Sequence, residues 1–333
     1  MSDPVLEVKD LKTHFFTRAG TVKAVDGVSF SVQRGEIVGL VGESGSGKTV
    51  TGFSLMGLVD PPGRIVSGSV SLNGTDLTGL SQKQMRKMRG ARIAMVFQDP
   101  MMTLNPVLTI GTQMCMAVTA HQSISKQAAR DRATQVLTRV GIPDARARLD
   151  AYPHQFSGGM RQRVAIAVAL LHSPDVIVAD EPTTALDVSI QAQILTEVHE
   201  LARETGTALV WISHDLSTVS SLASRLLVMY AGRIVEEGPV ATVLRDPRHP
   251  YTAGLLRALP ALAEPGTDLN QIPGTTPSLL DLPPGCPFLP RCERVSDLCT
   301  TEPSMSLSDN RGFRCHHPIE AERMDTNPGG DMA

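Results

Sequence analysis

One stretch of the chain has the residue types and spacing needed to hold a phosphate group: Gly42-Glu43-Ser44-Gly45-Ser46-Gly47-Lys48-Thr49. It follows the apolar run 37–41, which predicts a buried strand, and it precedes 50–58, which predicts a helix. Glycines let such a loop curl so that its N–H groups face one anion, and the helix start adds about half a positive charge. Lys48 could then reach the β- and γ-phosphates, and the Thr49 hydroxyl could bind Mg²⁺. The pattern predicts a nucleoside triphosphate site rather than an ordinary glycine-rich turn.

A second candidate site follows the apolar run 176–179, which ends in the carboxylates Asp180 and Glu181. If this run is a strand parallel to 37–41, Asp180 comes beside the Mg²⁺ site and can hold the metal, usually through water. Glu181, one residue further, can orient and deprotonate a water molecule that attacks the γ-phosphate. A strand ending in solvated acids is common, but the phosphate loop favours the catalytic interpretation.

A third stretch, Ser157-Gly158-Gly159-Met160, precedes an amphipathic helix and predicts another helix start that could bind an anion. A chain with one phosphate loop has no evident need for two such sites on one nucleotide. We therefore expect a dimer in which the second site of each subunit closes on the γ-phosphate held by the other. The alternative is an ordinary helix N-cap.

Composition limits the class of protein. Among 333 residues, 41% are hydrophobic, which allows a substantial core. The 31 basic and 34 acidic residues give a net charge of −3, which indicates no bulk attraction to nucleic acid or to an anionic bilayer. The chain starts without a signal-peptide pattern and contains no apolar run of about 18 residues. These features predict a cytosolic protein that does not itself span a membrane.

The order of strand-like and helix-like segments predicts an α/β fold. Residues 5–41 predict three short strands, 5–8, 28–32 and 37–41, with turns at 18–21 and 33–36, and 68–74 predicts another strand. Periodicity becomes helical from 109 to 141, which predicts a helical subdomain inserted at about 99–160. Strands at 92–97, 176–179, 208–212 and 225–230, separated by helices, imply a mainly parallel sheet.

Composition shifts after Gly238, and eight prolines lie between Pro260 and Pro290. We expect a nucleotide-binding domain over 1–259 and a small proline- and cysteine-rich extension over 260–320. The tail, 321–333, is expected to be disordered.

Across residues 5–238 these motifs appear in the order found in ATP-binding cassette (ABC) ATPases, which the chain resembles. The resemblance implies a cassette fold with an N-terminal antiparallel β part, and ATP hydrolysis. It implies that Gln98 contacts Mg²⁺ and the attacking water, that His214 clamps the γ-phosphate, and that 157–160 is the signature. Ala185-Leu186-Asp187 matches the loop that crosses to the partner subunit. The nucleotide contacts implied are Phe15, which stacks on adenine, Val22, Gly42, Ser44, Gly45, Ser46, Gly47, Lys48, Thr49, Val50, Ser157, Gly158, Gly159, Met160 and Asp187.

Four longer stretches resemble the D-type ATPase of dipeptide and oligopeptide importers: 97–106, 157–163, 249–256 and 286–292. This resemblance implies an energy-supplying subunit at the cytoplasmic face of the cell membrane. Its implied partners are a second, F-type ATPase chain, two membrane permeases and, indirectly, a substrate-binding protein. Members of this group also handle nickel and glutathione, so the cargo stays open.

Two other functions are possible in principle. A soluble cassette ATPase acting on nucleic acid or ribosomes would be expected to have a long coiled-coil insertion or two cassettes. This chain has about 110 residues between phosphate loop and signature, one cassette and no basic patch. A metal-sensing or redox module with a secondary ATPase would be supported by the cysteines alone.

Four of the five cysteines, Cys286, Cys292, Cys299 and Cys315, lie near the C-terminus, whereas Cys115 is expected in the core. Their spacings of five, six and fifteen residues fit neither the common zinc ribbons nor the ferredoxin patterns. Four thiolates could complete a zinc site or a [4Fe–4S] cluster, or they could be free. The resemblance to D-type subunits favours the iron–sulfur cluster, as a structural staple of the extension.

Overall fold

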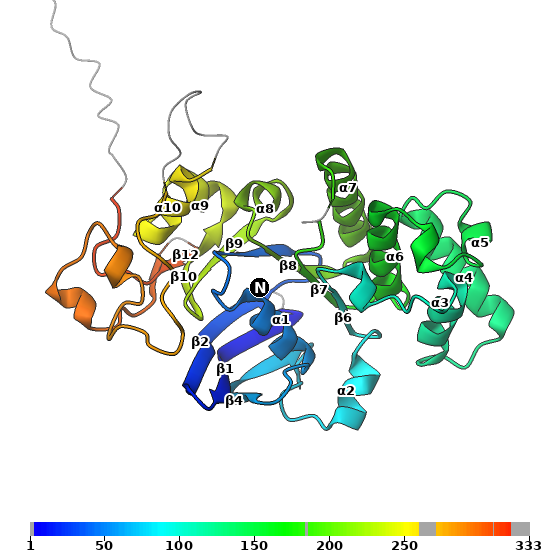
Figure 1. Ribbon diagram of the computed structural model, residues 1–333, viewed down its shortest axis with the longest axis horizontal. Coiled ribbons are helices and arrows are strands. Elements are labelled where there is room, and N and C mark those ends of the chain that lie inside the picture. Colours follow the sequence, from blue (N-terminus) through cyan, green and yellow to red (C-terminus); the bar gives the residue numbers. More distant parts are fainter. Residues whose placement is uncertain (1–2, 184–185, 260–270, 309, 321–333) are drawn as a thin grey trace, which may run out of the picture.

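The structure, a computed structural model, describes residues 3–183, 186–259, 271–308 and 310–320. A small antiparallel sheet and a larger, mainly parallel sheet form the body of the molecule (Figure 1). A group of helices lies at one end of this body, on the right in Figure 1, and the C-terminal segment lies at the opposite end. The predicted disordered tail and the segment 260–270 fall outside the described residues.

The antiparallel sheet has the strand order β2-β1-β4-β5. β1 and β2 are longer than the apolar runs suggested, and they meet in a two-residue turn at Arg18 and Ala19 instead of a turn over 18–21. The predicted strand 68–74 overlaps the end of a longer strand, β4, which pairs with β1 and ends two residues earlier than predicted. The strands are β1 (Leu6–Thr17), β2 (Gly20–Val32), β4 (Gly63–Leu72) and β5 (Thr75–Asp76).

The main sheet has the order β11-β12-β10-β9-β3-β8-β7-β6. The strands from β9 to β6 are parallel, whereas β10, β12 and β11 pair antiparallel. The last two strands come from the C-terminal extension, so the extension continues the sheet. The strands are β3 (Ile37–Val41), β6 (Ile93–Val96), β7 (Val176–Asp180), β8 (Ala208–Ser213), β9 (Arg225–Tyr230), β10 (Arg233–Pro239), β11 (Ser306–Ser308) and β12 (Arg311–Phe313).

Helices pack against both faces of the main sheet. α3, α4, α5 and α6 form the helical group between β6 and β7, and α4 buries Ala129, Ala133 and Leu137 on one face. Short 3₁₀ turns occur at Pro100–Met102, Pro153–Gln155, Leu289–Arg291 and Asp297–Thr300. The helices are α1 (Lys48–Met56), α2 (Gln82–Met88), α3 (Ile110–Thr119), α4 (Lys126–Arg139), α5 (Ala145–Arg148), α6 (Gly158–Leu170), α7 (Val188–Thr205), α8 (Leu216–Leu222), α9 (Val240–Arg245) and α10 (Pro250–Arg257).

The core has two parts, one on each face of the main sheet. Along β8, Val210 and Ile212 face the antiparallel sheet and α1, whereas Leu209 and Trp211 face the helical group. Successive strand residues point to opposite faces, so a strand buried on both faces is apolar throughout. Within the described residues, none of the helices combines the length and the apolarity that a membrane span requires.

Candidate nucleotide site

The carboxyl ends of β3, β6, β7 and β8 bring the candidate residues to one edge of the main sheet. Parallel strands end at the same edge, and loops that follow them meet there. The phosphate loop follows β3, Gln98 follows β6, Asp180 ends β7 and His214 follows β8. The resulting pocket has a volume of about 1010 Å³. Its lining includes Gly42, Ser44, Gly45, Gly47, Lys48, Thr49, Val50, Gln98, Glu181 and His214.

The phosphate loop requires glycine where the chain turns into α1. Gly47 is the N-cap of α1, with φ of +103°, and a Cβ added there would lie 2.1 Å from the Ala24 carbonyl oxygen. No other residue type fits both the backbone conformation and the space. Ser46 is buried, and its Oγ lies 3.5 Å from Lys48 Nζ. The backbone therefore curls tightly around the position that an anion would take.

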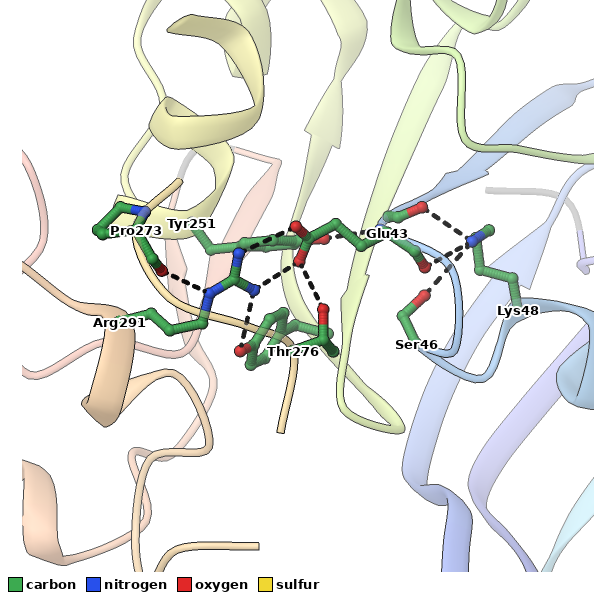
Figure 2. A network of polar contacts seen from close by, with 9 residues as sticks. Glu43, Ser46, Lys48, Tyr251, Pro273, Thr276 and Arg291 are labelled. Atoms are coloured by element: carbon green, nitrogen blue, oxygen red, sulfur yellow. Dashed lines mark hydrogen bonds and ion pairs between the residues drawn. The ribbon is translucent and has the colours of Figure 1, made fainter. Parts of the chain in front are cut away.

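Lys48 is buried within the loop. Its Nζ donates to the carbonyl oxygens of Gly42, at 2.8 Å, and Glu43, at 2.9 Å (Figure 2). Burial lowers the pKa of Lys48 below its ordinary value, and the negative charges of Glu181, Asp180 and Glu43 oppose that shift. The ammonium is held by carbonyl dipoles that do not neutralise it, so it can still attract a phosphate.

Asp180 lies beside Thr49, as the parallel-strand argument anticipates. The Thr49 hydroxyl donates to Asp180 Oδ1 at 3.1 Å. The pKa of Asp180 is raised to about 6, because burial, together with the charge of Glu181, outweighs the lowering effects of the Thr49 hydrogen bond and Lys48. A hydroxyl and a carboxylate side by side are oxygen ligands of the kind that Mg²⁺ prefers.

Glu181 connects the other two predicted catalytic residues. Gln98 Nε2 donates to Glu181 Oε2 at 3.2 Å, and His214 Nδ1 lies 3.0 Å from Glu181 Oε1. Glu181 has φ of +45°, a left-handed conformation that is costly for a residue with a Cβ, and its N–H donates to the Ile212 carbonyl at the end of β8. Such strain persists only where the surrounding structure imposes it, often at functional sites. The carboxylate is thus aimed into the pocket by its backbone.

The predicted adenine contacts lie at the other end of the pocket, where Phe15 of β1 and Val22 of β2 form one wall. Leu255 of α10 and Thr276 and Leu279 of the extension also line the pocket, and nothing in the sequence pattern predicts them there. The pocket lies between the antiparallel sheet and the C-terminal segment. The stretch 249–256 contains Leu255 and is one of those that resemble D-type ATPases, but that resemblance assigns it no role at the nucleotide site.

Glu43 was also missed, although it is an acidic residue inside a loop that would hold an anion. Its carboxylate accepts two hydrogen bonds from Arg291, at 2.7 and 3.0 Å, and one from Thr276 Oγ1 at 3.3 Å (Figure 2). Its backbone N–H donates to the Tyr251 hydroxyl at 2.8 Å. A carboxylate inside a phosphate-binding loop would repel the phosphates unless a cationic side chain pairs with it, but the sequence does not indicate which side chain does so.

The signature residues and Asp187 lie elsewhere. Ser157 caps α6 by accepting from Met160 N–H, and Ser157 and Gly158 are exposed. Neither 157–160 nor Asp187, the exposed residue before α7, lines the pocket. Ala185 falls outside the described residues. Within this chain, the structure therefore does not bring the signature to the phosphate loop.

The four C-terminal cysteines gather in the extension. All are free thiols; Cys299 is buried and the other three are partly buried. Burial raises the pKa of Cys286, Cys292 and Cys315, the last to about 11, and the neighbouring thiols add to each shift. Yet among the residues that the structure covers, no three His, Cys, Asp or Glu side chains are arranged to hold a metal ion. The structure thus gives no support to the predicted [4Fe–4S] cluster or to zinc.

Comparison with known families gives two matches. Residues 25–184 match the family described as ABC transporter. Residues 235–299 match the family described as Oligopeptide/dipeptide transporter, C-terminal region. The second match includes β10, α9, α10 and the stretch that carries Arg291.

Curated relatives match nearly the whole chain. Dipeptide transport ATP-binding protein DppD of Escherichia coli (strain K12) is 48% identical over 318 residues, which is 95% of this chain and 97% of the relative. Oligopeptide transport ATP-binding protein OppD of the same organism is 47% identical over 320 residues, 96% of this chain and 95% of the relative.

Solved structures of ATP-binding cassettes share the fold. A dimeric cassette in a post-hydrolysis state bound to ADP and Pi is 26% identical, with a TM-score of 0.64 over 71% of this chain and 98% of that chain. The protein cbiO1 of Clostridium perfringens, part of the ABC transporter complex cbiONQ, is 26% identical, with a TM-score of 0.62 over 73% of this chain and 91% of that chain. The predicted α/β cassette fold is confirmed.

Proposed function

Because the chain belongs to the ABC transporter ATP-binding proteins of the dipeptide and oligopeptide transport group, we propose that its ATPase activity powers the import of di- or oligopeptides. The observation that carries the catalytic part is the position of Glu181 between Gln98 and His214, in the pocket that Lys48 and Thr49 also line. The proposal that the cargo is a di- or oligopeptide is supported by the names of the relatives.

Each residue has a proposed role in hydrolysis. Lys48 and the loop N–H groups bind the β- and γ-phosphates, and Phe15 and Val22 contact the base. Thr49 and Asp180, with Gln98, would hold Mg²⁺, which when bound neutralises charge on the phosphates. Glu181 takes a proton from a water molecule while the oxygen of that water bonds to the γ-phosphorus. The bond between the γ-phosphorus and the bridging oxygen breaks, and that oxygen leaves with ADP. His214 orients Glu181 and contacts the γ-phosphate.

Replacing the base tests this assignment. Glu181→Gln keeps the size and one acceptor oxygen but removes the proton acceptor, so ATP binding is retained and turnover is nearly abolished. Binding and single-turnover hydrolysis should be measured on the same preparation. Near-normal hydrolysis by this variant would remove Glu181 from the role of base.

We also propose that the site is completed by a second cassette, whose Ser157–Met160 equivalent covers the γ-phosphate. The exposed α6 start and the dimeric cassette among the similar structures support this arrangement. The second cassette is expected to be a different, F-type chain, with Asp187 at the junction. Cross-linking of residue 158 to the partner in the presence of ATP tests it. Cross-links that place 157–160 far from the partner's phosphate loop during turnover would overturn it.

We propose that the chain works at the cytoplasmic face of the membrane, bound to two permease subunits, with a substrate-binding protein acting through them. Affinity purification from mildly solubilised membranes, followed by identification of the co-eluting chains, tests the assembly. Permeases and an F-type ATPase are expected. A fully active homodimer without membrane partners would favour a soluble cassette ATPase instead.

For the cysteines, we propose a four-thiol centre, with [4Fe–4S] ahead of zinc. The proposal rests on the resemblance of 286–292 to D-type subunits. The backbone N–H of Arg294 donates to Cys292 Sγ and that of His317 to Cys315 Sγ, each at 3.3 Å. Such N–H groups stabilise thiolates that bind metal. Iron, labile sulfide and zinc analysis of protein purified without oxygen tests it. A metal-free protein would overturn it.

A further inference from the structure

The C-terminal extension forms hydrogen bonds to the phosphate loop at Glu43. Glu43 is held at three points: its N–H by Tyr251, its carboxylate by Arg291 and Thr276, and its carbonyl by Lys48. Figure 2 shows Glu43 between the Arg291 guanidinium on one side and Lys48 on the other. Tyr251 belongs to the stretch 249–256 and Arg291 to the stretch 286–292, and both contact the same residue of the phosphate loop.

Arg291 is well fixed on its own side. Its side chain is only 4% exposed, and its Nε donates to the Pro273 carbonyl at 2.9 Å. It also approaches the Tyr230 hydroxyl at the end of β9, at 3.4 Å. A guanidinium that forms two parallel bonds to a carboxylate fixes its orientation as well as its distance. Because Arg291 is fixed in the extension and Glu43 in the phosphate loop, a shift of the extension would also shift Glu43.

Charge makes this pair important for nucleotide binding. Glu43 is the second residue of an eight-residue loop that must receive a polyanion, and its side chain is 28% exposed. An unpaired carboxylate within this loop would repel the phosphates and could compete with them for Lys48. Arg291 neutralises the carboxylate and keeps it turned away from Lys48, toward the extension.

We propose that Arg291 is a positioning residue for ATP binding, which acts by holding Glu43, so that the extension sets the ATP affinity of the cassette. The proposal rests on the proposed function, since it assumes that ATP binds this pocket. The coupling is reciprocal: nucleotide that favours the ordered loop also favours the seated extension. The extension is therefore a working part of the nucleotide site in addition to its place in the sheet.

A double-mutant cycle on the full chain tests the proposal. Arg291→Met should weaken ATP binding about tenfold or more, the equivalent of about 1.4 kcal/mol. Adding Glu43→Gln removes the unpaired carboxylate, so the double variant should bind ATP more tightly than Arg291→Met alone. In the assembled transporter, Arg291→Met should raise KM more than it lowers kcat, because the catalytic carboxylate is untouched.

Arg311→Met is the matched control. Arg311 is another buried arginine of the extension, 7% exposed, and it pairs with Glu236 and Asp246, which do not line the pocket. It should lower the melting temperature while leaving ATP affinity unchanged. If Arg291→Met does not fold, Arg291→Lys keeps the charge but loses the paired geometry, and it should give an intermediate affinity.

Hydrogen exchange gives a second readout. ATP should slow exchange at 289–294 in the wild type, and this protection should be lost in Arg291→Met. The inference is overturned if the wild type binds ATP and Arg291→Met binds it equally well, or if the double variant binds no better than Arg291→Met. A wild type that binds no ATP would instead overturn the proposed function.

Discussion

Two helices in this chain begin with glycine-rich turns suited to an anion, and their surroundings differ. At the start of α1, the ends of three parallel strands, β6, β7 and β8, add Gln98, Asp180, Glu181 and His214 around the buried Lys48. At the start of α6, Ser157 and Gly158 face solvent. The difference shows that a helix start becomes a reaction site only when the fold supplies chemistry opposite it. For α6, the proposed second cassette would supply that chemistry.

The largest expected effect is at α1. Lys48→Ala removes the buried ammonium and should weaken ATP binding by at least about 100-fold, given the worth of charge-assisted contacts in a dry site. Lys126→Ala is the matched control, because Lys126 is also the first residue of a helix but is exposed. Calorimetric titration with MgATP should separate the two variants. Equal binding by Lys48→Ala and wild type would mean that the α1 site owes nothing to its lysine.

At α6 the expected loss is confined to the assembly. A Cβ at Gly158 would meet no atom within 4 Å, so Gly158→Asp should fold and bind ATP normally as an isolated chain. In the assembled transporter the new carboxylate would face the partner's γ-phosphate and abolish hydrolysis at that site. Gly158→Ala, which adds volume without charge, should retain most activity. Loss of ATP binding by isolated Gly158→Asp would contradict the division between the two helix starts.

The same contrast explains what the sequence could predict. Parallel strands end at one edge, so apolar runs followed by polar residues were enough to anticipate that Asp180 and Thr49 would lie together. The lengths of β1 and β2 were underestimated because polar residues such as Lys9 and Lys23 face solvent, and apolar runs end before the strands do.

Contacts of the extension could not be predicted in this way. Arg291 is 248 residues from Glu43, in a proline-rich segment with no periodicity to orient it. The strands β11 and β12 are three residues each, too short for an alternation pattern to be recognised. Only the packed structure shows that this segment extends the main sheet and closes the nucleotide pocket.

The next largest expected effect is on the stability of the folded chain, and it comes from Asp180 at the end of β7, beside the start of α1. The pKa of Asp180 is raised to about 6, above its unfolded value, so the folded state binds this proton more tightly and the free energy of unfolding falls as pH rises through that range. Asp180→Asn removes the buried charge. At pH 7 without Mg²⁺ it should be more stable than wild type by up to about 3 kcal/mol.

The gain from Asp180→Asn should shrink as the pH falls from 7 and should approach zero only below about pH 3, under the unfolded pKa of Asp, where the wild-type carboxyl is protonated in both states. Urea unfolding of both proteins across this range measures it. Mg²⁺-dependent hydrolysis should be lost in the variant. A gain that does not vary with pH would show that the ionised carboxylate is not the source of the difference.

The smallest expected effect distinguishes capping from catalysis at α6. The Ser157 hydroxyl accepts from Met160 N–H, and Ser125 caps α4 in the same way through Ala128 N–H. Ser157→Ala and Ser125→Ala should each lower the free energy of unfolding by about 0.5–2 kcal/mol. If α6 is only a capped helix, both substitutions will leave hydrolysis by the assembly unchanged. If Ser157 faces the partner's γ-phosphate, Ser157→Ala alone will lower kcat. Equal kcat values for the two variants would leave Ser157 without a part in the composite site, since their effects on stability are matched.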